Sequence, residues 1–95
     1  MLNSFFPDYM VEAISADVVC ETSQGTYIGW FDRSKANRKD TAPAIEAQPV
    51  WKIKFIETTK DSEGSSLVRT LYPNGVKEYQ HVWDERTSLT YKYAN

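Results

Sequence analysis

The stretch LVRTLYPNGVKEYQHVWDERTSLTYKY, residues 67–93, carries the strongest hairpin signal in the chain. It predicts a strand over residues 67–72, a tight turn at Pro73-Asn74-Gly75 and a returning strand over residues 76–83. Asn-Gly suits such a turn because both residues tolerate the positive φ angles that a two-residue hairpin loop needs. We therefore expect Asn74 and Gly75 to set the register of an antiparallel hairpin.

The remainder of this stretch predicts one helical turn and a final strand. Asp84 can cap a turn over residues 85–87, and Arg86 can form an ion pair or stack on an aromatic ring. Adjacent carboxylates at 84 and 85 could support acid–base chemistry, but neighbouring turn residues point in different directions, which favours a structural role. The last strand is expected over residues 88–93, with Trp83 and Tyr91 in the core.

Working outward, residues 17–22 and 26–31 predict a first hairpin with a glycine in its short loop. Gly29 predicts a bulge, or a close approach by another backbone. Residues 50–58 form the clearest strand, because Trp51, Ile53 and Phe55 alternate with two lysines. That alternation predicts one face in the core and the other in water.

These elements predict a mainly β fold in a single domain over residues 1–95. The chain has 41% hydrophobic and 14% aromatic residues, which is the composition of a folded protein with an aromatic core. We expect a small antiparallel sandwich or partly closed barrel of five to seven strands.

Two segments stand outside this scaffold as candidate contact regions. Residues 1–16 form either a short N-terminal helix or an extended arm. The arm's aromatic residues dock on the domain's own core or on a neighbouring subunit; they are Phe5, Phe6 and Tyr9. Residues 32–49, DRSKANRKDTAPAIEAQP, predict a long charged loop with one helical turn. Its basic side chains give either a solvated surface or a partner contact; they are Arg33, Lys35, Arg38 and Lys39.

No cofactor, metal or catalytic site is expected from the sequence. His81 is the only histidine and Cys20 the only cysteine, so neither has partners at metal-ligand spacing. No nucleophile motif or phosphate-binding glycine loop is present. The net charge of −2 makes nucleic acid an improbable partner, and no apolar run is long enough for a membrane span. We therefore expect a non-enzymatic protein with protein partners.

The chain resembles a group of small, uncharacterised proteins encoded by tailed bacteriophages. The matching residues are Tyr27-Ile28-Gly29, Trp51-Lys52-Ile53, Tyr72-Pro73-Asn74-Gly75 and the run VWDERTSLTY at residues 82–91. The resemblance implies a phage origin and a virion or virion-assembly role, in the host cytoplasm or the particle. The charged segment 32–40 departs from the pattern, where a shorter connection rich in glycine and proline is expected.

Three functions follow as expectations. The first is a structural or assembly protein of a phage particle (head, neck or tail) that contacts itself or other virion subunits. The second is a small phage protein that binds and inhibits a host enzyme or defence factor. The third is a carbohydrate-binding module that stacks sugars on exposed Trp30, Trp51 or Trp83.

Overall fold

A computed structural model describes residues 15–95 of the chain. The predictions for Phe5, Phe6, Tyr9 and the rest of segment 1–14 lie outside the described residues. Two short 3₁₀ helices, η1 and η2, accompany six strands. In chain order the elements are β1 (Val18–Thr22), β2 (Gly25–Phe31), η1 (Ile45–Ala47), β3 (Pro49–Lys60), β4 (Ser66–Pro73), β5 (His81–Val82), η2 (Trp83–Ser88) and β6 (Tyr91–Lys92).

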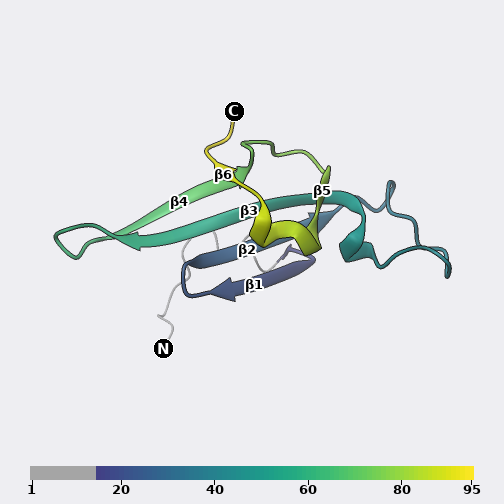
Figure 1. Ribbon diagram of the computed structural model, residues 1–95, viewed down its shortest axis with the longest axis horizontal. Coiled ribbons are helices and arrows are strands. Elements are labelled where there is room, and N and C mark those ends of the chain that lie inside the picture. Colours follow the sequence, from purple (N-terminus) through teal and green to yellow (C-terminus); the bar gives the residue numbers. More distant parts are fainter. Residues whose placement is uncertain (1–14) are drawn as a thin grey trace.

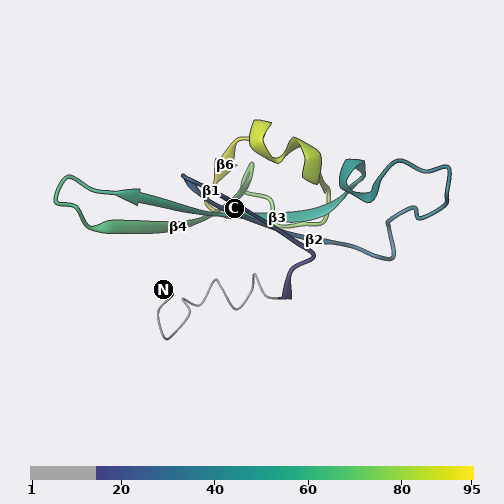
Figure 2. The same ribbon diagram turned by 90° about the horizontal axis from the view of Figure 1, so that it is seen from below.

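The strands form one antiparallel sheet in the order β1-β2-β3-β4-β6, and β5 pairs with the beginning of β3 (Figure 1). The mainly β architecture and the predicted strand number are confirmed. The sheet stays open and is not closed into a barrel. Helix η2 lies over one face of the sheet, on the same side as η1 (Figure 2). Strand β3 is central, because every other strand except β1 and β6 pairs with it.

The core forms where η2 covers β2 and β3. Trp83 of η2 packs beside Trp51 of β3 with ring centroids 5.5 Å apart, and both side chains are almost fully buried. Gly29 makes this contact feasible, because a Cβ atom there would lie only 2.6 Å from the Trp83 ring. The predicted close approach at Gly29 is therefore made by an aromatic side chain rather than by a backbone.

Both faces of β3 are buried in its middle, so the prediction that one face lies in water is wrong. Ile53 and Phe55 are buried on the face below η2, and Ile56 is buried on the other face. Lys54 is also only 8% exposed, and its ammonium lies within 6 Å of the ring centroids of Trp30 and Tyr72. Long lysine stems pack against aromatic rings, so an alternating lysine does not by itself mark a solvent face.

The Asn74-Gly75 turn does not make the predicted hairpin. Both residues have positive φ, 52° and 75°, as a tight turn requires. However, the chain after Gly75 leaves the sheet, and only His81–Val82 forms a strand, which pairs with β3. Strand β6 occupies the place beside β4 instead, and the Asn74 N–H donates to the carbonyl of Thr90 at 2.7 Å.

The helical turn after Val82 is confirmed, but its cap is not. Helix η2 begins at Trp83, Val82 is its N-cap, and no side chain caps it, so Asp84 lies inside the turn. Arg86 does stack as predicted, with its guanidinium carbon 4.6 Å from the Trp83 ring centroid. The final strand is shorter than predicted, Tyr91–Lys92, and it pairs with β4 at Tyr72 and Pro73.

Candidate partner-binding pocket

The long loop between β2 and β3, residues 32–48, is here called the basic loop. It contains the predicted helical turn, η1, and is fastened at its base by the buried side chain of Gln48. The Gln48 oxygen accepts a hydrogen bond from the Asn37 N–H at 2.8 Å. Its amide nitrogen donates to the carbonyls of Asn37 at 2.7 Å and Pro43 at 2.9 Å. These three bonds give the loop a fixed path although it is long.

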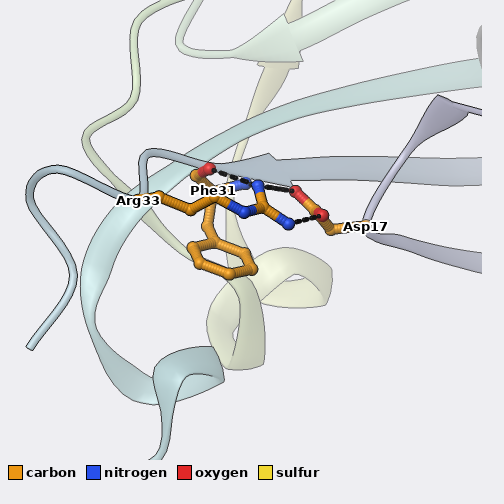
Figure 3. Close-up of polar contacts among 3 residues, drawn as sticks. All are labelled: Asp17, Phe31 and Arg33. Atoms are coloured by element: carbon orange, nitrogen blue, oxygen red, sulfur yellow. Dashed lines mark hydrogen bonds and ion pairs between the residues drawn. The ribbon is translucent and has the colours of Figure 1, made fainter. Parts of the chain in front are cut away.

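A second attachment holds the start of the basic loop to the sheet (Figure 3). Arg33 Nη2 lies 2.6 Å from Oδ1 of Asp17, and the Phe31 N–H donates to Oδ2 of the same carboxylate at 3.0 Å. The Arg33 guanidinium carbon also lies 4.3 Å from the centroid of the Phe31 ring. The ion pair therefore orients Arg33 across the ring at the end of β2.

The electrostatics of this attachment follow from its contacts. The hydrogen bond from Arg33 holds the pKa of Asp17 below its usual value, and the Phe31 N–H acts in the same direction. The same pair raises the pKa of Arg33. Next in the chain, hydrogen bonds from the Ser34 hydroxyl and N–H lower the pKa of Asp32. Asp32 thus stays ionised while it shapes the first turn of the loop.

Between these two attachments, the basic loop and Phe31 at the end of β2 line an open pocket of about 520 Å³. Its walls combine three cations, one aromatic ring, one amide side chain and four small or aliphatic residues. The lining residues are Phe31, Arg33, Asn37, Arg38, Lys39, Ala42, Pro43, Ala44 and Ile45. The pocket has the volume of a ligand site, and its lining combines apolar and cationic side chains.

Arg38 and Lys39 are the two lining cations that have no anionic partner within residues 15–95. Within residues 15–95 neither makes an ion pair, whereas Arg33 is paired with Asp17. The Arg38 guanidinium carbon lies 5.9 Å from the Phe31 ring centroid, on the pocket side. The backbone carries both residues in a turn, in which the Asn37 side chain accepts from the Lys39 N–H and the Lys39 carbonyl accepts from the Ala42 N–H.

Three of the four predicted basic contact residues meet at the pocket: Arg33, Arg38 and Lys39. Lys35 does not, because its ammonium donates to the carbonyl of Tyr79 at 2.8 Å and ties the basic loop to the segment before β5. Sequence reasoning missed Phe31 and Gln48. Phe31 was visible only as a strand-end aromatic, and nothing local distinguishes Gln48 from a surface residue.

Other residues considered for chemistry have structural surroundings. His81 Nε2 lies 3.1 Å from the carbonyl of Val76, and no group of three metal-ligating side chains occurs within residues 15–95. Trp51 and Trp83 are buried, so among the three tryptophans only the partly exposed Trp30 could stack on a sugar. Burial raises the pKa of the Tyr91 phenol, whose hydroxyl donates to the carbonyl of Arg86. None of the helices in the described part of the chain could span a membrane.

Comparison with known proteins found no family, no curated protein and no solved structure that matches this chain.

Proposed function

We propose that this chain is a non-enzymatic binding protein that acts through protein–protein contacts, as a structural or assembly component of a phage particle. The sequence resemblance supports the phage setting, and the pocket of the basic loop supports the mode of action. The observation that carries the contact is the pair of cations Arg38 and Lys39, which make no ion pair within residues 15–95 and lie with the Phe31 ring in the lining of a fastened loop.

An acidic protein segment has the chemistry that this pocket recognises. Carboxylates would meet Arg38 and Lys39, and a neighbouring apolar side chain would rest on Phe31 and Ile45. The chain as a whole has a net charge of −2, so the positive charge at the pocket is a local feature. Two free cations are few for nucleic acid, where binding usually neutralises several phosphates at once.

The fastened loop also favours binding in energetic terms. A mobile loop loses conformational freedom when a partner orders it, and this cost lowers the affinity. Because Gln48 already holds Asn37 and Pro43 in place, the positions of Arg38 and Lys39 are set before a partner arrives. The contact is therefore preorganised at its backbone, and only the two long side chains need ordering.

The experiment uses a fluorescent acidic peptide that contains glutamates and one phenylalanine, with a lysine peptide of the same length as its counterpart. Fluorescence anisotropy should show binding of the acidic peptide alone, weakening by about tenfold from low salt to about 0.3 M salt. R38E/K39E should abolish binding, whereas K77E/K92E, an equal charge change outside the pocket lining, should retain it. An equal loss of peptide binding in both variants would show that net charge alone drives the binding. It would contradict a specific contact at the pocket.

The phage setting has a separate test. Mass spectrometry of purified particles of the phage that encodes the chain should detect it at a stoichiometry typical of a structural protein. Its absence from particles, together with one stoichiometric host protein in cross-linked infected cells, would replace assembly with inhibition of a host factor.

A further inference from the structure

Strands β3 and β4 extend beyond the rest of the sheet as a two-stranded ribbon (Figure 1). Strand β2 accompanies β3 only as far as Glu57, but β3 and β4 remain paired to Lys60 and Ser66. On the other side, β6 pairs with β4 only at Tyr72 and Pro73. Within residues 15–95, the outer edge of β4 over residues 66–70 therefore has no strand beside it.

The direction of the free backbone groups follows from one hydrogen bond. The Thr58 N–H donates to the carbonyl of Gln24, on the β2 side of β3. Thr58 is opposite Val68, so this pair exchanges no hydrogen bonds, and the N–H and C=O of Val68 point away from β3. Because direction alternates along a strand, Ser66 and Thr70 present their backbone groups on the same outer edge.

The next residue of β4 whose backbone groups point to the outer edge already pairs with a strand. Tyr72 pairs with β6, and beyond it the Asn74 N–H donates to the carbonyl of Thr90. The outer edge of β4 is thus a functioning pairing edge that is filled at one end and open at the other. The open part is bounded by β6 on one side and by the turn at residues 61–65 on the other, and its midpoint is Val68.

This edge has little of the usual protection against pairing. Residues 66–70, SLVRT, contain no proline or lysine, and all five are exposed, Val68 by 56%. Arg69 is the only charge, and its guanidinium lies 3.7 Å from the carboxylate of Glu57 on β3. A strand that approached this edge would meet backbone donors and acceptors beside an exposed valine.

We infer that the open edge of β4 pairs with the same edge of a second copy of this chain, antiparallel about a two-fold axis at Val68. The free length and its midpoint select this register. It places Val68 opposite Val68 and Ser66 opposite Thr70, and each such pair exchanges two backbone hydrogen bonds. Arg69 faces Leu67 rather than another Arg69, so no like charges are opposed. The pairing is independent of the proposed function, because it uses neither the basic loop nor its pocket.

The test is sedimentation velocity over a concentration series up to about 1 mM, with disulfide trapping as a second readout. The wild-type chain should dimerise, and V68K should weaken association at least about tenfold by setting two lysines side by side. V19K makes the same change on the exposed face of the opposite edge strand, β1, and should dimerise like the wild type. Circular dichroism of both variants checks that the fold is retained.

Disulfide trapping tests the register. In a Cys20→Ala background, V68C should oxidise rapidly to a covalent dimer, because Cα atoms of a hydrogen-bonded antiparallel pair lie about 5.5 Å apart, within disulfide range. R69C, which faces Leu67, should cross-link far more slowly. A wild-type monomer throughout the series, a dimer that V68K leaves intact, or equal cross-linking of V68C and R69C would overturn the inference. R38E/K39E should leave the dimer unchanged, which separates this result from that of the pocket.

Discussion

The two ends of strand β3 have the same alternating backbone but opposite surroundings. At its beginning, Trp51 lies under Trp83 with β2 on one side and β5 on the other. At its end, Thr59 and Lys60 are exposed, and within residues 15–95 β4 is the only strand beside them. From this difference we infer that stability is concentrated where η2 covers the sheet. We expect the exposed side chains of the ribbon and of the basic loop to contribute little to stability.

The largest loss of stability is expected when the end of β3 that lies under η2 loses the aromatic ring that covers it. Trp83→Ala removes the ring that packs on Trp51 and Gly29, and should lower the free energy of unfolding by about 3–5 kcal/mol. Val68→Ala on the ribbon removes an exposed side chain and should change it by less than about 0.5 kcal/mol. Urea unfolding followed by tryptophan fluorescence and circular dichroism measures both. A similar loss of unfolding free energy in the two variants would contradict the difference between the two ends of β3.

The glycines of the two turns that flank β4 give a matched pair of intermediate size. Gly64 and Gly75 both have positive φ, 86° and 75°, so alanine is strained at either position, by about 1 kcal/mol. A Cβ at Gly64 meets nothing within 4 Å, whereas one at Gly75 would lie 2.8 Å from the carbonyl of Tyr93. Gly75→Ala should therefore cost about 1–3 kcal/mol more than Gly64→Ala in thermal or urea unfolding. An equal loss of stability in the two variants would mean that the C-terminal segment around Tyr93 moves away from the added Cβ atom at no cost.

A smaller effect is expected at the attachment of the basic loop. Asp17→Asn removes the ion pair with Arg33 and should lower stability slightly at neutral pH. Because the folded pKa of Asp17 lies below its unfolded value, near 3.8, this contribution is complete above that value and is lost as the pH falls through the folded pKa. The stabilities of wild type and variant should therefore differ at neutral pH and converge as the pH falls below the folded pKa of Asp17. A stability difference between wild type and variant that grew as the pH fell would contradict the predicted direction of the pH dependence.

The sequence predicted elements whose signals are local. The first hairpin, the strand around Trp51, the helical turn of the basic loop and the stacking of Arg86 all follow from nearby residues. The strand after Gly75 could not be predicted, because Asn74-Gly75 fixes two φ angles but not which strand pairs with β4. That choice depends on contacts with residues 90–95, far along the chain.

The candidate site was predictable in part for the same reason. Clustered charge identified Arg38 and Lys39, but the pocket depends on contacts between distant residues. Gln48 bonds to Asn37 eleven positions away, and Arg33 lies over the Phe31 ring while it is paired with Asp17, sixteen positions before it. The buried Lys54 was assigned to water because alternation reports direction and not what covers each face.

The smallest expected effect on stability is also the most direct test of the separation between scaffold and contact surface. Urea unfolding of R38E/K39E should give a midpoint indistinguishable from that of the wild type, since neither residue makes an ion pair within residues 15–95. K77E/K92E provides the charge-matched control. Loss of stability in R38E/K39E that approaches that of Trp83→Ala would contradict the account, because the basic loop would then belong to the scaffold.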